Sequence, residues 1–210
     1  MNIRDRIIRT LILAVVGLLV GGLAALWSVN HEPSSDASGS SHQLVATSIG
    51  GPFHLIDQDG QPRSENDWPG KYKLVYFGFT YCPAICPTEL SKMAEAVLAL
   101  TPVDRSKLQP LFISVDPERD TPEVLKNYVA LFMPELVGLT GSLEQVEAAK
   151  KAYKVYAAKV PDEDGKGGYT MDHSSLIYLM SPEGQAIGMF KASDSAKVIE
   201  DRLRSVLDAK

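Results

Sequence analysis

The sequence predicts an α/β domain, and three observations carry that prediction. An apolar run from Leu74 to Phe79 is typical of a buried strand. Apolar residues at helical spacing follow it, from Leu90 to Leu98. A second buried run, Leu108 to Val115, is again followed by helix-start signals, at Asp120 to Glu123. Strands that alternate with helices favour a sheet whose central strands are parallel.

The remaining elements complete a recognisable order. In chain order we expect a hairpin at 53–61 with an Asp-Gly turn, the strand at 74–79, a helix from Pro87, the strand at 108–115, a helix from Asp120, a strand at 137–140, a helix from Ser142, a polar glycine-rich loop at 161–168, strands at 176–180 and 187–190, and a helix at 194–207. This order is that of a thioredoxin-like domain with an N-terminal hairpin extension, whose last hairpin is antiparallel.

The N-terminal segment has a different character. No charged residue occurs from Thr10 to Asn30, a length sufficient to span a bilayer, and three arginines precede it. The positive-inside rule places these arginines in the cytoplasm. A cleaved signal peptide is the alternative, and the length of the apolar run argues against it.

These features divide the chain into four parts. We predict a cytoplasmic N-terminus at 1–9, a transmembrane anchor at 10–30, a flexible linker at 31–49 and the thioredoxin-like domain at 50–210. We expect the bacterial inner membrane, with the C-terminal domain in the periplasm, because a long Arg- and Ser-rich transit segment is absent.

Composition narrows the classes of function. The chain has 210 residues and a formal net charge of -5, so it has no overall attraction to nucleic acid. Its only two cysteines, Cys82 and Cys86, cannot form a disulfide framework for a domain of this size. They are a redox pair, a metal-binding pair or a single structural bridge.

Both cysteines lie where the first buried strand passes into its helix, which is where open α/β sheets bind ligands. Cys82 and Cys86 are one helical turn apart, so both sulfurs can lie on the same side. We expect a tight turn between them and a regular helix from Pro87. A helix N-terminus favours the thiolate, the form that binds metals and attacks disulfides.

A histidine far along the chain can complete this site. His173 precedes the strand at 176–180, whose start lies beside the cysteines in a thioredoxin-like fold. Two thiolates and one imidazole suit copper, whereas structural zinc requires four ligands and no fourth is evident. Taken alone, His173 fits a hydrogen-bonded histidine at a strand end equally well. The other histidines, His31, His42 and His54, are expected to be ordinary linker or strand residues.

Three separated motifs carry a resemblance to a known family. They are Tyr81-Cys82-Pro83-Ala84-Ile85-Cys86-Pro87, then Ile113-Ser114-Val115-Asp116-Pro117-Glu118-Arg119-Asp120-Thr121-Pro122, then Asp172-His173-Ser174-Ser175. In this order they resemble the SCO/SenC family of copper-binding, membrane-anchored, thioredoxin-like proteins that help to assemble cytochrome c oxidase. The resemblance extends from about Gly50 to the C-terminus and includes the anchor.

The resemblance implies a copper site made by Cys82, Cys86 and His173. The thiolates would hold Cu(I), and His173 would also allow Cu(II) to bind. The implied partner is cytochrome c oxidase subunit II, whose dinuclear CuA site receives the copper, and a periplasmic copper donor protein is a second expected partner. The family often has Asp where this chain has Ala84, so one negative charge is missing beside the site.

Two other functions remain open at this point. The same cysteines can serve a thiol–disulfide oxidoreductase that reduces the target cysteines of subunit II, although thioredoxin-type enzymes have one residue fewer between them. Such an enzyme would need Cys82 and Cys86 but not His173. An inert bridge is the third possibility, and it would close too small a loop to stabilise the fold much.

The second motif also allows two interpretations. Asp116, Arg119 and Asp120 either dock a partner and tune the site, or serve as turn and helix-cap residues. The second interpretation is favoured, with Asp120 as the acidic cap of the following helix. Phe79 and Tyr81 are expected either to wall the site or to pack in the core.

Overall fold

The computed structural model describes residues 49–162 and 168–208, and their order of strands and helices confirms the α/β class. The strands are β1 (His54–Asp57), β2 (Pro62–Ser64), β3 (Tyr72–Gly78), β4 (Leu108–Ser114), β5 (Val137–Thr140), β6 (Ala157–Pro161), β7 (Tyr169–His173), β8 (Leu176–Met180) and β9 (Ala186–Lys191). The helices are α2 (Ile85–Leu98), α3 (Pro102–Ser106), α4 (Pro122–Val129), α5 (Leu143–Tyr153) and α6 (Ala196–Asp208), with a 3-10 turn at Glu65–Asp67.

The predicted N-terminus at 1–9, the anchor at 10–30 and all but the last residue of the linker at 31–49 lie outside the described residues, as do His31 and His42. Within the described ranges, no helix is long and apolar enough to cross a membrane.

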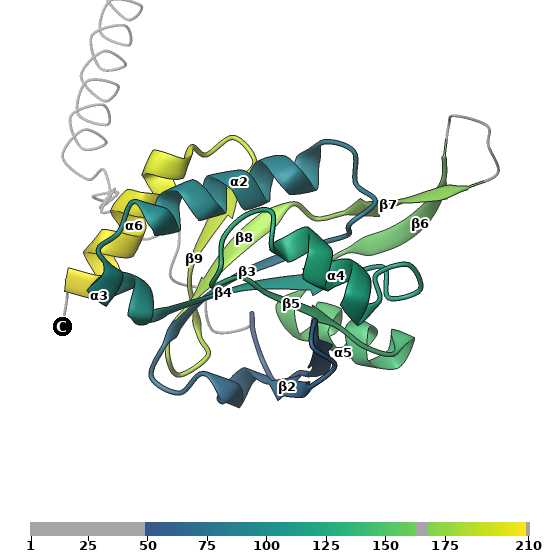
Figure 1. Ribbon diagram of the computed structural model, residues 1–210, viewed down its shortest axis with the longest axis horizontal. Coiled ribbons are helices and arrows are strands. Elements are labelled where there is room, and N and C mark those ends of the chain that lie inside the picture. The colour runs from purple at the N-terminus through teal and green to yellow at the C-terminus, as the bar shows by residue number, and fades with distance from the viewer. Residues whose placement is uncertain (1–48, 163–167, 209–210) are drawn as a thin grey trace, which may run out of the picture. The chain divides into compact units, whose positions relative to one another are not determined.

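Seven strands form one sheet in the order β2-β1-β5-β4-β3-β8-β9 (Figure 1). The central strands β3, β4 and β5 are parallel, with Val75 of β3 opposite Leu111 of β4. The last hairpin, β8 and β9, is antiparallel, and so is the N-terminal hairpin of β1 and β2. The thioredoxin-like arrangement and the hairpin extension predicted from the sequence are therefore confirmed.

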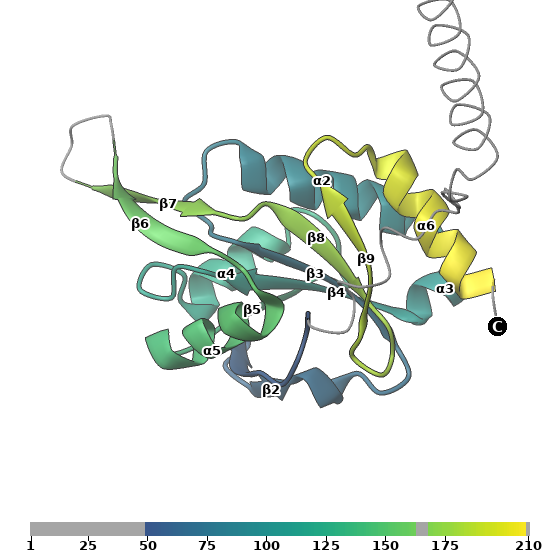
Figure 2. The same cartoon turned by 180° about the vertical axis from the view of Figure 1, so that it is seen from behind.

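Helices cover both faces of this sheet. The side chains of β3 point alternately to the two faces, so the strand packs against helices on both sides. On one face Phe77 contacts Tyr153 of α5, with ring centroids 5.2 Å apart. On the other, Tyr76 stacks on Phe112, which contacts Tyr128 of α4 at 5.5 Å. Helices α2, α4 and α6 share this second face, and α5 covers the first (Figures 1 and 2). Burial on both sides explains why β3 is apolar throughout.

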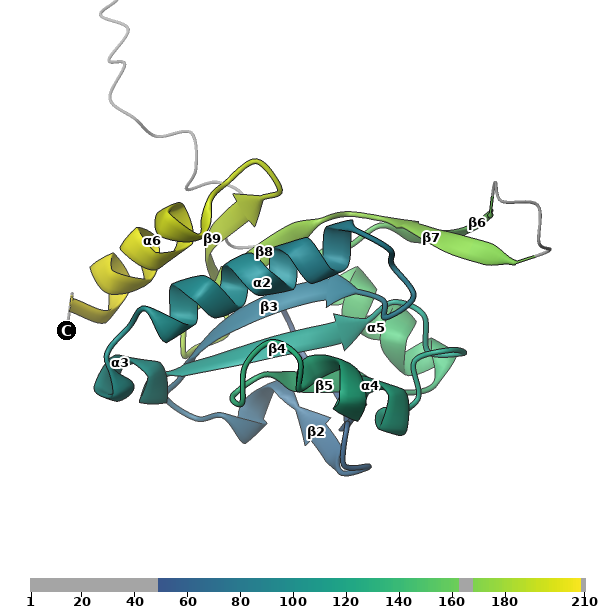
Figure 3. The same ribbon diagram turned by 45° about the horizontal axis from the view of Figure 1, so that its top comes forward.

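A second, two-stranded sheet was not predicted. Strands β6 and β7 pair antiparallel with each other, with Ala157 opposite His173, and project away from the main sheet (Figure 3). The sequence interpretation began its loop at Pro161, which is the last residue of β6, and placed His173 between this loop and the strand at 176–180, without predicting β7. The structure corrects this, because His173 is the last residue of β7.

Two helix starts differ from the prediction. Helix α2 begins at Ile85, two residues before the predicted start at Pro87, so Cys86 lies in its first turn. The N-cap of α4 is Thr121, whose side-chain oxygen accepts from the Val124 N–H, so Asp120 is not the cap. Asp120 instead points into the protein.

Candidate metal site

The two cysteines lie in a turn that follows β3, which we call the cysteine turn (residues 80–86). The Cys82 N–H donates to the Phe79 carbonyl oxygen at 3.4 Å, which closes the turn after the strand. Cys86 is fully buried in the first turn of α2, whereas Cys82 is half-buried, and both are free thiols. The predicted pair therefore consists of one accessible sulfur and one sheltered sulfur.

His173 reaches the cysteine turn from β7. Its Nε2 lies 3.5 Å from the Cys86 sulfur, and its Nδ1 lies 3.1 Å from the carbonyl oxygen of Ser174. A carbonyl oxygen only accepts hydrogen bonds, so Nδ1 carries the proton and Nε2 keeps its lone pair directed at the sulfur. This is the tautomer that a metal-binding histidine needs, because its other ring nitrogen is fixed by a backbone acceptor.

The two thiols differ in acidity. The hydrogen bond from the Cys86 side chain is the largest effect that lowers the pKa of Cys82, to about 3, and the Cys86 N–H adds to it. That N–H lies 3.3 Å from the Cys82 sulfur. The same bond to Cys82, together with burial, raises the pKa of Cys86. Cys82 is therefore the first thiolate of the pair, and the shared proton stays with Cys86.

Aromatic side chains fix the orientation of His173. The Phe79 ring meets the imidazole edge-on with centroids 5.7 Å apart, and Tyr76 does so at 6.3 Å. The Tyr76 hydroxyl lies 3.1 Å from the Ser175 Oγ. Phe79 thus both packs in the core and walls the site, whereas Tyr81 is 67% exposed and is not a core residue.

The residue of β3 that lies against the Cys86 sulfur has no room for a side chain. A Cβ on Gly78 would lie 3.0 Å from the Cys86 sulfur and 2.9 Å from the Phe112 ring. Sequence analysis did not single out Gly78, although a glycine inside an apolar strand often marks a close approach.

The three predicted ligands are neighbours without forming a closed cage. Among the residues that the structure describes, no three His, Cys, Asp or Glu side chains are already grouped to hold a metal ion. Cys86 and His173 face each other, and the Cys82 sulfur interacts with the Cys86 side chain and accepts from the Cys86 N–H. Two thiolates and one imidazole are a donor set that suits copper, whereas a structural zinc site takes four ligands.

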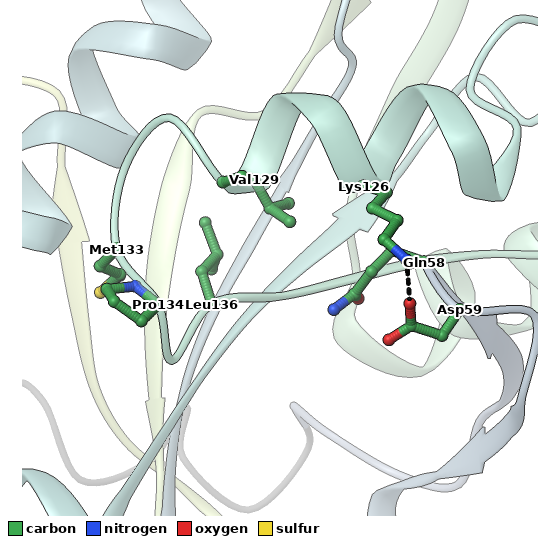
Figure 4. A pocket seen from close by; sticks show the side chains of 8 residues that line it. Gln58, Asp59, Lys126, Val129, Met133, Pro134 and Leu136 are labelled. Atoms are coloured by element: carbon green, nitrogen blue, oxygen red, sulfur yellow. Dashed lines mark hydrogen bonds and ion pairs between the residues drawn. The ribbon is translucent and has the colours of Figure 1, made fainter.

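The cysteine turn is exposed at Tyr81 and from Pro83 to Ile85. A hollow between α4 and the β1–β2 turn contains none of the predicted ligands (Figure 4); its lining is Gln58, Asp59, Lys126, Val129, Ala130, Met133, Pro134 and Leu136. An ion pair of 2.8 Å between Lys126 and Asp59 spans it. The cysteine turn is instead at the surface, where a partner protein can reach Cys82.

Asp120, in the second sequence motif (residues 113–122), stabilises the start of the cysteine turn. Asp120 is completely buried and accepts from the Thr80 hydroxyl and the Ser114 hydroxyl, both at 2.6 Å, and from the Thr80 N–H at 3.1 Å. It therefore fastens the start of the turn to β4. Its assignment as a helix cap was wrong because Thr121 performs that role.

Comparison with known proteins agrees with this picture. The model of the family SCO1/SenC matches residues 41–208. The chain is 43% identical over 175 residues to Protein SCO2, mitochondrial, of Saccharomyces cerevisiae, covering 81% of this chain and 57% of that protein. The chain therefore spans little more than half of that relative.

Solved structures have the same fold. One is Arabidopsis thaliana ScoI with copper bound, with a TM-score of 0.72 and 41% identity over 77% of this chain and 99% of that one. Another is BsSco, described as having a disulfide switch and as a member of the Sco family of cytochrome c oxidase assembly proteins, with a TM-score of 0.60 and 27% identity over 79% and 96% of the two chains. The matched region contains the cysteine turn, the loop at 116–120 and His173, and the chain belongs to the SCO1/SenC family.

Proposed function

We propose that this protein binds copper through Cys82, Cys86 and His173 and delivers it to the CuA site of cytochrome c oxidase subunit II. The observation that carries the proposal is the approach of His173 Nε2 to the Cys86 sulfur at 3.5 Å, with the Nδ1 proton held by Ser174. The copper-bound relative with the same fold supports the choice of metal. Thiolate and imidazole ligands suit Cu(I), and the imidazole also allows Cu(II).

The arrangement suits the release of copper as well as its binding. Cys82 is the accessible thiolate, so a thiolate of the acceptor can approach the copper from that side and replace the ligands one at a time. His173 belongs to a hairpin that pairs with no strand of the main sheet. It can withdraw without disturbing the sheet, whereas Cys86 is fixed in α2.

We further propose the arrangement in the membrane. Residues 1–9 lie in the cytoplasm, 10–30 form a single-span anchor in the bacterial inner membrane, 31–49 are a linker, and the domain at 50–210 lies in the periplasm. The charge-free run and the arginines before it support this orientation. A periplasmic donor protein would then supply the copper on the same side of the membrane as subunit II.

A transfer experiment tests the proposal. Full-length protein in detergent, loaded with copper, is mixed with the reduced, metal-free CuA domain of subunit II, and the optical bands of CuA are followed. We expect transfer by the wild type and almost none by Cys82→Ser, Cys86→Ser or His173→Ala. His54→Ala is the matched control, because His54 is an exposed histidine on β1. Wild-type protein that holds copper but never fills the acceptor would contradict delivery.

A second candidate is a thiol–disulfide oxidoreductase, favoured by the low pKa of Cys82 beside a buried thiol. The Cys82 thiolate would attack a disulfide of subunit II and release one target thiolate. Cys86 would then lose its proton and attack Cys82, which releases the second target thiolate and leaves a Cys82–Cys86 disulfide. Two electrons pass to the target, and an external dithiol must restore the pair.

The variant His173→Ala distinguishes the two candidate functions. If His173→Ala reduces an oxidised CuA domain at the wild-type rate but no longer transfers copper, both roles use the same sulfurs. If it reduces the target and the wild type transfers no copper, the oxidoreductase is the function.

A further inference from the structure

Arg119 contacts two parts of the site that lie far apart in the chain. It lies in the loop between β4 and α4, and its guanidinium contacts both Tyr169 of β7 and Tyr81 of the cysteine turn. We propose that Arg119 is a positioning residue that holds the β6–β7 hairpin, and with it His173, against the cysteine turn. The consequence for copper rests on the metal site proposed above.

On the hairpin side, Arg119, Tyr169 and Asp116 form a closed ring of contacts. Arg119 Nη1 donates to the Tyr169 carbonyl oxygen at 2.8 Å, and the guanidinium lies 3.8 Å from the centroid of the Tyr169 ring. The Tyr169 hydroxyl donates to Asp116 Oδ1 at 2.8 Å, and Asp116 Oδ2 accepts from Arg119 Nε. The carboxylate is buried, so these charge-assisted bonds are poorly screened by solvent.

On the cysteine side, the guanidinium packs against aromatic rings. It lies 4.8 Å from the centroid of Tyr81, and Arg119 Nη2 is buried without a hydrogen-bond partner in the described part of the chain. Ring faces therefore take the place of an acceptor for that nitrogen. The Phe79 ring lies 5.9 Å from the guanidinium and 5.7 Å from the His173 ring. The contacts of Arg119 thus extend to the imidazole itself.

Besides the contacts of Arg119, the hairpin is attached through Met171 of β7, which is buried in the core. Lys159 of β6 pairs with Glu118 at 2.6 Å, but both side chains are exposed and such pairs contribute little. At the base, the Tyr156 N–H donates to the Ser174 hydroxyl, beside His173. Without Arg119 the hairpin would keep its base and the buried Met171 side chain, but Tyr169 would lose its bond and stacking contact with the loop between β4 and α4. Residues 169–173 would therefore open more often.

Two measurements on full-length protein in detergent test this role. Hydrogen–deuterium exchange of the reduced, metal-free protein reports the opening of residues 169–173. The dissociation rate of Cu(I) into a competing chelator reports the consequence for the metal. Arg119→Lys keeps the charge but loses the planar group that stacks and bonds through two nitrogens. We expect faster exchange in β7 and about tenfold faster release of Cu(I), the usual effect of losing a residue that orients a ligand.

The matched control is Arg63→Lys. Arg63 Nε pairs with the buried carboxylate of Asp57 at 2.7 Å, so it has the same kind of ion pair, but it lies on the edge strand β2. We expect Arg63→Lys to leave exchange in β7 and copper release unchanged. Equal behaviour of Arg119→Lys and wild type, or the same loosening of β7 in Arg63→Lys, would overturn the proposal.

Tyr81→Leu keeps the proposal testable if Arg119 variants fold poorly, because Tyr81 is mostly exposed and its loss does not endanger the core. We expect it to speed exchange in β7, with an effect that is not additive with that of Arg119→Lys in the double variant. Unchanged β7 exchange in Tyr81→Leu contradicts the connection. The exchange experiment uses metal-free protein, so it decides the role of Arg119 even if the wild type binds no copper and the proposed function fails.

Discussion

The sulfur of Cys86 lies 3.5 Å from Nε2 of His173, although 87 residues separate them in the chain. The fold creates this contact, because β3 carries the cysteine turn at its end and pairs with β8, which follows His173 directly. A buried thiol and a correctly protonated imidazole then face each other beside an accessible thiolate. The predictions below follow from that geometry.

Substitution of Gly78 should disturb the site through Cys86. A methyl group there would lie 3.0 Å from the sulfur, so Gly78→Ala must displace Cys86 or the strand. We expect a loss of about 1–3 kcal/mol in the free energy of unfolding, typical of overpacking, and weaker Cu(I) binding. Denaturant unfolding and a chelator titration measure the two effects. Gly168→Ala is the control, since nothing lies within 4 Å of its added Cβ; equal effects of both changes would contradict the account.

Alkylation should distinguish the two cysteines. The pKa of Cys82 is lowered to about 3, so its thiolate persists well below neutral pH, whereas Cys86 is buried and keeps its proton. Iodoacetamide at pH 5 should label Cys82 and spare Cys86, as mass spectrometry can show. Between pH 5 and 8 the labelling rate of Cys82 should stay nearly constant. A rate that rises about tenfold per pH unit would indicate an ordinary thiol, with a pKa near 8.5.

The same pKa shift has a consequence for stability. The folded state lowers the pKa of Cys82 below that of the unfolded thiol, so the folded state binds fewer protons between the two values. The contribution of Cys82 is therefore complete above pH 8.5 or so and declines as the pH falls towards about 3. We expect Cys82→Ser to lose less stability at pH 5 than at pH 8 relative to wild type, measured by urea unfolding. A larger loss of stability at pH 5 than at pH 8 would contradict this prediction.

Removal of Asp120 should loosen the cysteine turn. Asp120→Ala leaves the Thr80 N–H and two buried hydroxyl groups without their acceptor, at a cost of about 2–3 kcal/mol in the free energy of unfolding. Asp104→Ala is the control, because the Asp104 carboxylate makes only exposed hydrogen bonds, to Thr101 and Lys107, and its loss should cost about 1 kcal/mol or less. Denaturant unfolding of both variants compares them, and equal losses would contradict the role given to Asp120.

Much of this architecture could be predicted because burial leaves a strong pattern. The continuous apolar runs of β3 and β4 and the helical spacing after each are local signals, and the cysteines lie at a junction that the fold exposes. The β6–β7 hairpin lacks such a pattern, since its strands are half-exposed and Pro161 and the glycines beyond it indicate a loop. His173 was therefore assigned to a connection rather than to the strand that carries it.

Residues that act through distant contacts were the least predictable. Asp120 precedes a threonine and a proline at a helix start, which is a cap signal, and only the tertiary structure shows Thr80 and Ser114 around its carboxylate. Arg119 gave no signal of its connection to Tyr169, which is fifty residues away. The exposure of Tyr81 was also hidden, because an aromatic residue after an apolar strand favours a core position.

A competition titration with Cu(I) tests the central claim most directly. Reduced full-length protein in detergent competes anaerobically with a chelator for Cu(I), with Cys82→Ser, Cys86→Ser, His173→Ala and the control His54→Ala measured in parallel. We predict one copper per wild-type chain, binding weakened by about tenfold or more in each of the three site variants, and no change in the control. A wild type that binds no copper, or an affinity that survives His173→Ala unchanged, would contradict the proposed site.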